Sequence, residues 1–400
     1  MDPAELAARA SYGRLLSILA VRTRDVAGAE DALAEAFLAA VAQWPVEGVP
    51  RSPEAWLLTA ARRKLVDAAR RRRTRDEKRA LLEVDFDEAD GNVFGDERLR
   101  LLFVCAHPAI EAAVRTPLML QTVLGLDAAR IASALRVAPK TMGQRLWRAK
   151  TKIRDAGISF DVAVEDLPGR SFAVLEAIYA AYGSGWEDVA GQAAASRGLT
   201  EEAIWLARLT VRLLPDEPEA RGLLALMLYA EARATARRGE TGEYVPLTEQ
   251  DPSRWDPRRI AEAEAILQET ARMGRVGPLQ IEAAIQSAHI DARRTGARDD
   301  RALSLLYEAL VRMAPTLGVR IAHAVALSNT EGAAHAIERL DAIESSASED
   351  YQPYWSARAH LLERLGRLGD ARDAYERAIG LAEDDGVRRW LLAKKRALGT

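Results

Sequence analysis

The residues best suited to chemistry in this sequence are basic and aromatic, and they gather in two blocks. The first block, "WLLTAARRKLVDAARRRRTR" (56–75), begins with a tryptophan and contains four consecutive arginines. At helical spacing, one side of it carries Trp56, Thr59, Arg63, Arg70 and Arg73. Such cations neutralise phosphates, and an aromatic ring beside them can stack an unpaired base. The pattern indicates a nucleic-acid ligand; the alternative is a solvated charged face with Trp56 in a small core.

The second block, "KTMGQRLWRAKTKIR" (140–154), holds six basic residues and no acid. It follows a short helix expected at 126–137 and a tight turn, which together predict a helix-turn-helix. Helical phase places Met142, Leu146, Ala149 and Ile153 on the core side. The outward side and its flanks carry Lys140, Thr141, Gln144, Arg145, Arg148 and Lys152. Arginine and glutamine there can reach base edges in a major groove, and the lysines suit phosphates.

Three further residues of this helix, Trp147, Lys150 and Arg154, are given roles of their own. We expect Trp147 to pack against the protein rather than to stack on a base. We expect Lys150 and Arg154 to contact phosphates together with Lys152. The alternative for the whole segment is a plain helical hairpin without a ligand.

The elements that position these blocks are predicted to be helices throughout. Ala, Leu, Arg and Glu dominate the 400 residues and β-branched residues are sparse, which indicates an all-α fold class. The stretch 29–44 places Leu33, Phe37, Ala40 and Trp44 on one apolar stripe, and 45–53 is rich in proline and is expected to be a loop.

Charge divides the chain into segments although its net charge is only −3. The acidic stretch 83–97 separates the two basic blocks, and no comparable basic block follows residue 160. We therefore expect a helical domain at 1–80, an acidic linker at 81–98, a helix-turn-helix domain at 99–158 and a helical C-terminal domain at 170–400.

Several classes of protein are disfavoured by the composition. The single cysteine, Cys105, allows no internal disulfide and fits a reducing cytoplasm. The N-terminus is expected to be neither a signal peptide nor a membrane span. The five histidines do not cluster with carboxylates at ligand spacing, and neither a phosphate loop nor a serine elbow is present. We expect no enzymatic activity, no cofactor and no metal.

The order of these stretches resembles a known family. "AEDALAEAFLAAVAQWP" followed by "SPEAWLLTAARRKLVDAARRRR", then the acidic linker, then "GLDAARIASALRVAPKTMGQRLWRAKTKIRDAGI", resembles extracytoplasmic-function (ECF) sigma factors of the sigma-70 family. The first two stretches look like region 2 and the last looks like region 4. The stretches 96–110, 206–233 and 251–267 resemble a subgroup with a long C-terminal helical extension, so the resemblance covers nearly the whole chain.

The resemblance implies core RNA polymerase and promoter DNA as partners. Glu30, Asp31, Glu35 and Phe37 would then bind the clamp of the β′ subunit, and region 4 would meet the flap of β. Trp56, Thr59, Arg63, Arg70 and Arg73 would recognise and melt the minus-ten element, with a flipped base captured by the loop near residues 44–54. The residues of the second block, from Lys140 to Lys152, would recognise the minus-thirty-five element.

The sequence departs from that subgroup at one motif. The subgroup has two adjacent cysteines before His-Pro, whereas this chain has Cys105, Ala106, His107 and Pro108. One thiol and one imidazole do not make a metal site. We expect a core role for Cys105 and a helix-capping role for His107.

The C-terminal half is predicted to contain helical repeats. Trp355, Ala359, Leu362, Gly366, Ala371, Tyr375 and Ala378 fit the spacing of a tetratricopeptide (TPR) repeat. Aromatic residues at such positions usually pack in the core that neighbouring repeats share. Our hypothesis for the long loop 239–256 is that it contacts region 2 or region 4 of the same chain.

A second class of function is kept beside the sigma factor. A helix-turn-helix regulator with a TPR-like sensor domain would bind DNA without polymerase. The region 2-like block argues against it, because such a regulator needs no polymerase-docking helix.

Overall fold

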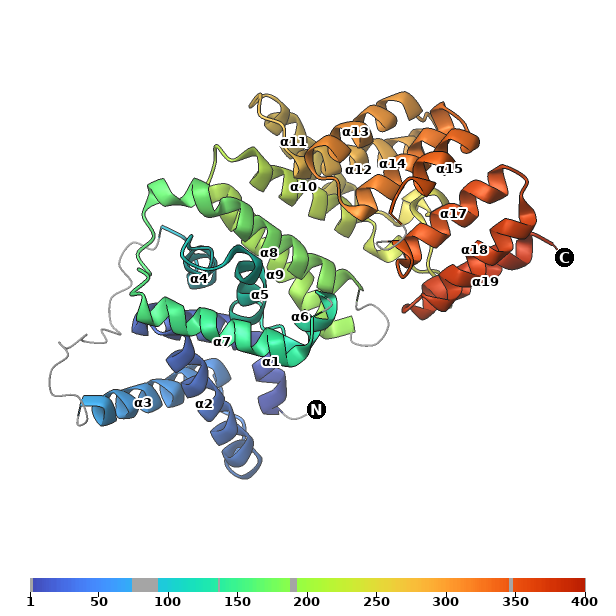
Figure 1. The fold of residues 1–400 in the computed structure, drawn as a ribbon. Helices are drawn as coiled ribbons and strands as arrows, with labels where there is room; N and C mark the ends of the chain where they lie inside the picture. Colours follow the sequence, from blue (N-terminus) through green and yellow to red (C-terminus); the bar gives the residue numbers. More distant parts are fainter. Residues whose placement is uncertain (1–2, 74–92, 136, 188–192, 345–347, 400) are drawn as a thin grey trace. The chain divides into compact units, whose positions relative to one another are not determined.

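Helices form the regular structure of this protein wherever its residues are described. The computed structural model describes residues 3–73, 93–135, 137–187, 193–344 and 348–399 (Figure 1). Apart from helices, these residues contain an isolated β-bridge between Arg238 and Tyr244. The predicted all-α fold class is confirmed. Most of the predicted acidic linker, residues 81–92, lies outside the described residues, as do the side chains of Arg70 and Arg73.

The chain divides into two compact units, residues 1–215 and residues 216–400. The helices of the first unit are α1 (Pro3–Thr23), α2 (Val26–Glu47), α3 (Pro53–Arg73), α4 (Glu97–Cys105), α5 (Ala112–Thr122), α6 (Ala128–Ala134), α7 (Pro139–Asp155), η1 (Val164–Asp166), α8 (Leu167–Glu187) and α9 (Ala193–Leu213). None of the helices described in either unit is long and apolar enough to cross a membrane.

Helix α1 lies at the centre of the first unit. It packs against α2 and α3 on one side and against α4, α5 and α9 on others. Leu15, Leu16 and Leu19 are fully buried in these contacts. A Cβ at Gly13 would lie 1.8 Å from the carbonyl oxygen of Val123, so α1 can approach the end of α5 this closely only with glycine there.

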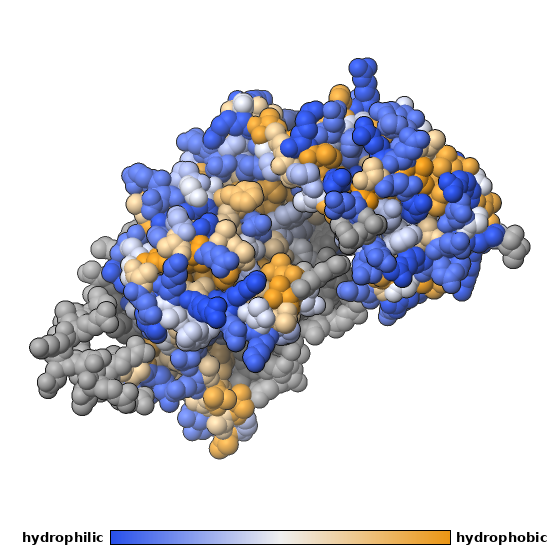
Figure 2. All heavy atoms as spheres, viewed as in Figure 1, coloured by the Kyte–Doolittle hydropathy of each residue, from blue (hydrophilic) through white to orange (hydrophobic). Residues whose placement is uncertain are grey.

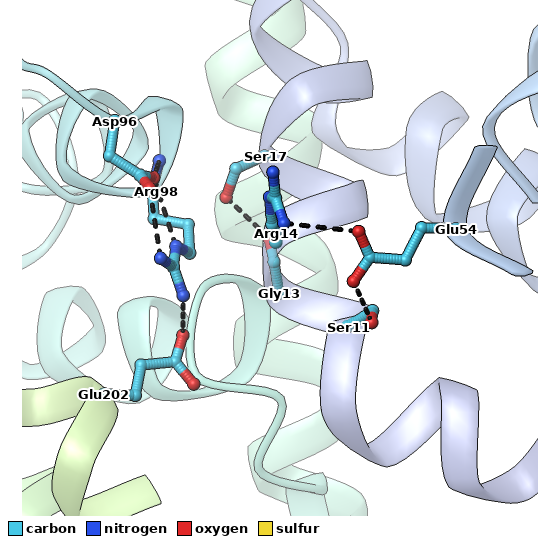
Figure 3. A network of polar contacts seen from close by, with 8 residues as sticks. All are labelled: Ser11, Gly13, Arg14, Ser17, Glu54, Asp96, Arg98 and Glu202. Carbon is cyan, nitrogen blue, oxygen red and sulfur yellow. Dashed lines mark hydrogen bonds and ion pairs between the residues drawn. The ribbon is translucent and has the colours of Figure 1, made fainter. Parts of the chain in front are cut away.

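Helices α8 and α9 belong to the first unit because they complete its core. α8 packs on α4 and α5, and α9 packs on α8. Arg98 of α4 donates to Glu202 of α9 at 2.5 Å (Figure 3) and lies 4.6 Å from the ring centroid of Trp205. The division at residue 215 therefore differs from the C-terminal domain start predicted at residue 170.

The second unit is a series of packed helices. They are α10 (Pro218–Ala232), η3 (Ala234–Ala236), η4 (Leu247–Glu249), η5 (Pro252–Arg254), α11 (Pro257–Ala271), α12 (Pro278–Thr295), α13 (Asp300–Met313), α14 (Leu317–Thr330), α15 (Ala333–Asp341), α17 (Gln352–Arg364), α18 (Leu368–Gly380) and α19 (Asp385–Ala397). Helices neighbouring in sequence pack on each other, as in α13 with α14 and α17 with α18. One apolar core extends from α14 to α19, and a smaller one joins α12 and α13.

The residues at TPR spacing lie in the α17–α18 hairpin. Ala359, Leu362, Ala371, Tyr375 and Ala378 are buried there, and Trp355 is half-buried. Gly366 has a φ of 72° in the turn, a conformation that favours glycine. These positions pack as expected, and the assignment of the whole unit to the TPR class stays a prediction.

The loop 239–256 packs on the last helix of its own unit. Next to the loop, Arg238 donates to both carboxylate oxygens of Asp384, at 2.9 and 2.6 Å. The ring of Tyr244 meets that of Trp390 edge-on at 5.8 Å, and Lys394 pairs with Glu249 at 2.8 Å. These contacts hold the loop against α19, and its contact with region 2 or region 4 stays a prediction.

Candidate nucleic-acid and polymerase interface

The hairpin of α2 and α3 is held by the apolar stripe that the sequence predicts. Leu33, Ala40 and Trp44 are buried and Phe37 is half-buried. The ring of Trp56 meets that of Trp44 edge-on, with centroids 5.6 Å apart. Trp56 is therefore half-buried at the edge of this core, where part of its ring reaches the surface.

The loop between these helices is shorter than predicted. α2 continues through Pro45 to Glu47, where the backbone N–H of Gly48 donates to the carbonyl of Trp44 at 3.0 Å. Gly48 has a φ of 89°, which ends the helix. The prediction of a loop from residue 45 is wrong at its start, because the burial of Trp44 stabilises the last turn of α2 despite the proline.

The start of α3 is fixed by contacts with α1 (Figure 3). Glu54 accepts hydrogen bonds from Ser11 Oγ at 2.5 Å and from Arg14 Nη1 at 3.2 Å. Ser17 Oγ donates to the carbonyl of Gly13 within α1. The direction of the basic helix α3 is thus set at its N-terminal end by polar contacts with α1, beside the apolar packing of Leu57 and Ala61.

The outward face of α3 is exposed where its side chains are described. Thr59 and Arg63 are exposed, and Thr59 Oγ1 donates to the carbonyl of Ala55 at 2.8 Å. Lys64, the residue after Arg63 in α3, forms an ion pair with Glu35 of α2 at 2.9 Å. α3 extends to Arg73, so it includes Arg70 and Arg73 although their side chains lie outside the described residues.

The structure separates the two sides of α7 as predicted. Met142, Leu146, Ala149 and Ile153 are buried. All six candidate DNA contacts are exposed: Lys140, Thr141, Gln144, Arg145, Arg148 and Lys152. α6, capped by the carboxylate of Asp127 on the N–H of Arg130, packs on α7 as the first helix of the pair.

Two expectations for α7 are wrong. Trp147 does not pack: 64% of its surface is exposed. Lys150, expected at a phosphate, is buried, because α7 packs with this side against α2 and α5. A side chain that flanks the apolar side of a helix is buried only where another helix packs against it. Helical phase alone does not predict whether such a helix is present.

Lys150 instead joins the two predicted functional helices. Its ammonium forms an ion pair with Glu30 of α2 and donates to Gln121 Oε1 at 3.0 Å. Tyr12 donates to the same Glu30 carboxylate at 3.3 Å, and burial together with this carboxylate raises the pKa of Tyr12. Glu30 thus belongs to a polar cluster between α1, α2, α5 and α7.

The four residues expected to bind polymerase have different surroundings. Glu30 is held by Lys150 and Glu35 pairs with Lys64. Asp31 is exposed, and Phe37 is half-buried between the helix core and the surface. Of these side chains, the carboxylate of Asp31 is the most directly accessible to a partner.

An apolar surface at the end of α2 was missed by the analysis of the sequence. Leu38 and Val46 are 69% and 85% exposed, and Val41 and Val49 are exposed as well. Figure 2 shows apolar atoms gathered at the free end of α2, lowest in the view. Val46 and Val49 lie on either side of Gly48 where α2 ends, and Leu38 and Val41 are exposed earlier on α2. Valines on both sides of Gly48 in a predicted loop are the signal that could have indicated it.

Cys105 has the core role that we expect. It is fully buried, and its sulfur lies 3.7 Å from Thr122 Oγ1. Burial raises the pKa of its thiol to about 12, which disfavours the reactive thiolate. His107 follows the end of α4, and its Nδ1 accepts the backbone N–H of Ala109 at 3.1 Å, so it stabilises the turn before α5 rather than a helix end.

Comparison with known proteins identifies two families. Residues 8–75, which cover most of α1 and all of α2 and α3, match sigma-70 region 2. Residues 170–271, from α8 to α11, match a family of unknown function, DUF6596. The chain is 39% identical over 364 residues to the uncharacterized protein R00370 of Rhizobium meliloti (strain 1021), which covers 88% of this chain and 86% of the relative. No solved structure matches the chain.

Proposed function

Because this chain belongs to the sigma-70 family, with a region 2 domain at its N-terminus, we propose that it is an ECF-type sigma factor that directs core RNA polymerase to specific promoters. The observation that carries the proposal is that the region 2 match covers the hairpin of α2 and α3. Exposed acidic and apolar residues on α2 and exposed basic residues on α3 give this hairpin two surfaces for two partners.

The α2–α3 hairpin is proposed to recognise and open the minus-ten element. Flipping a base out of the stack costs a few kcal/mol, and stacking on an aromatic ring returns about 1–3 kcal/mol. The exposed edge of Trp56 and the apolar residues Val46 and Val49 beside the loop suit such a base. Arg63, with Arg70 and Arg73 further along α3, supplies cations for the phosphates.

The α6–α7 pair is proposed to read the minus-thirty-five element as a helix-turn-helix. Gln144 is exposed on the N-terminal half of α7 and Arg148 is exposed one turn further along, and side chains in this part of a recognition helix reach base edges in a major groove. Lys140, Arg145 and Lys152 surround them and suit phosphate contacts.

The exposed side of α2 is proposed to bind the clamp of the β′ subunit. Asp31 is exposed, and Leu38 adds apolar surface two turns further along the same face of α2. Glu30 is held by Lys150 in the free chain, so it contributes to polymerase binding only when α7 moves away from α2. The region 4-like part would meet the flap of β. The polymerase performs the chemistry, and the protein acts in the cytoplasm without a cofactor.

The test of this function is run-off transcription from genomic fragments with purified core RNA polymerase, with and without the chain. Specific new transcripts are expected with the chain. Asp31→Lys combined with Leu38→Asp should abolish them by preventing association with core, whereas Glu165→Lys, an exposed site on η1, should not. Retention of specific DNA by the protein alone, with no transcripts and no co-elution with core, would favour the helix-turn-helix regulator.

The C-terminal unit is proposed to regulate or stabilise the factor. Truncation to test this should follow Pro215 rather than residue 158, where the predicted helix-turn-helix domain ends, because α8 and α9 cover the core of the first unit. We expect residues 1–215 to keep the promoter choice and to change the amount of transcript. Identical transcript levels from the truncated and full chains would contradict a regulatory role.

A further inference from the structure

Trp147 is the largest exposed apolar side chain on the helix proposed to enter the major groove. It is 64% exposed, which is unusual for an indole in a well-packed domain. It lies one turn after Gln144 and next to Arg148, on the side of α7 away from the buried Leu146 and Ile153. Its position therefore belongs to the surface that would face DNA.

The neighbouring turn leaves room for the ring. Side chains in a helix lean toward its N-terminus, and Gly143 lies one turn before Trp147 on that side. A Cβ at Gly143 would meet nothing within 4 Å. Gly143 therefore places no side chain beside Trp147, whose exposure the structure already shows.

The charges around Trp147 indicate what the exposed ring meets. Lys140, Arg145, Arg148, Lys152 and Arg154 are all exposed on α7, and the helix has no acid before Asp155. Such a surface complements the phosphates on both sides of a groove and repels a basic protein surface. By helical phase, Lys140 and Arg154 lie two turns before and after Trp147 on its own side of α7, whereas Arg145 and Lys152 lie on the opposite flank. With phosphates bound on both sides, the apolar ring between Lys140 and Arg154 would then reach the edges of the bases.

The chemistry of the major groove leaves one natural partner for an apolar ring. Its edges present hydrogen-bond donors and acceptors and, at thymine alone, an exposed 5-methyl group. We propose that Trp147 contacts the 5-methyl group of a thymine in the upstream promoter element and so contributes to the choice of promoter. This inference rests on the proposed sigma function, within which it adds a residue that reads a base by apolar contact.

The test compares thymine with uracil, which lacks only the methyl group. Holoenzyme is assembled from core polymerase and the full chain, and its affinity is measured for promoters found by run-off transcription. Each thymine of the upstream element is replaced in turn by deoxyuridine. At one position we expect about threefold to fivefold weaker binding by the unaltered protein, the size expected for one buried methyl group.

Variants of Trp147 identify the residue that senses the methyl group. With Trp147→Ala, the thymine and uracil promoters should bind equally. With Trp147→Phe, which keeps an apolar ring and loses the indole N–H, a difference of about twofold or more should remain. Phe172→Ala removes another exposed aromatic ring, on α8, and should leave the full difference between thymine and uracil.

Three results would overturn the inference. Uracil could have no effect at any position, or the same effect with Trp147→Ala as with the unaltered protein. Trp147→Ala could also weaken association with core in the absence of DNA, which would assign the ring to a protein contact. Failure of the unaltered chain to form a promoter-binding holoenzyme would instead refute the proposed function itself, and the inference with it.

Discussion

Two tryptophans at the two basic blocks have opposite surroundings. Trp56 starts the basic face of α3 and is half-buried against Trp44 of α2. Trp147 lies within the basic helix α7 and is mostly exposed. From the sequence, Trp56 was the ring expected to meet a base and Trp147 the ring expected to pack. The difference teaches that helical phase gives a side chain its direction, while its exposure depends on the helix that packs across from it.

The largest effect that we expect from the difference between Trp56 and Trp147 is on the free energy of unfolding. Trp44→Ala should destabilise α2 and α3 by about 3–5 kcal/mol, because it leaves a cavity beneath Trp56. Trp147→Ala should change stability by no more than about 0.5 kcal/mol, as surface substitutions do. Amide hydrogen exchange in α2, α3 and α7 measures both local stabilities. Similar costs at the two sites would show that Trp147 is packed in solution.

Lys150 and Lys152, two of the lysines of α7, offer a second contrast. Lys150→Gln leaves Glu30 without its cation and should cost about 1–3 kcal/mol, less than a fully buried pair because Glu30 is partly exposed. Lys152→Gln, on the exposed side, should stay within about 0.5 kcal/mol. Hydrogen exchange in α2 and α7 measures the loss. Adding Glu30→Gln to Lys150→Gln should recover part of it, and no recovery would contradict the pairing.

The exposed side of α7 should determine the preference for the upstream element. Arg148→Ala and Gln144→Ala should each reduce discrimination at one base pair by about 1–3 kcal/mol. The measurement is holoenzyme affinity for promoters with single base-pair changes. If Arg148→Ala weakens binding equally for every sequence, Arg148 is a phosphate contact and the base-reading part of α7 is smaller than proposed.

The basic face of α3 should contribute to promoter binding without preference for a base sequence. Each of its residues should have a smaller effect on binding than Gln144 or Arg148. Arg63→Ala combined with Arg70→Ala should lower promoter opening and reduce the salt dependence of binding by about one ion per cation removed. Core binding should not change, because the proposed core-binding residues Asp31 and Leu38 belong to α2 and are left unaltered. Permanganate reactivity of unpaired thymines measures opening. Unchanged opening with weaker core binding would assign the face to polymerase.

Much of the architecture could be predicted because it depends on local patterns. The all-α class, the Trp44 stripe, the cap at Asp127 and the core side of α7 all follow from helical periodicity and from residues that bind free backbone groups. The exposure of Thr59, Arg63, Gln144 and Arg148 follows for the same reason. A strongly polar side chain on the outer face of an amphipathic helix has no favourable place in a core.

Local patterns in the sequence therefore indicate which residues form helices and which side of each helix is apolar. The tertiary structure alone decided which helices meet: that α8 and α9 complete the first unit, that Lys150 of α7 reaches Glu30 of α2, and that Trp147 stays uncovered. The physical reason is distance along the chain. Glu30 and Lys150 are 120 residues apart, and a contact between them depends on packing that no local pattern records.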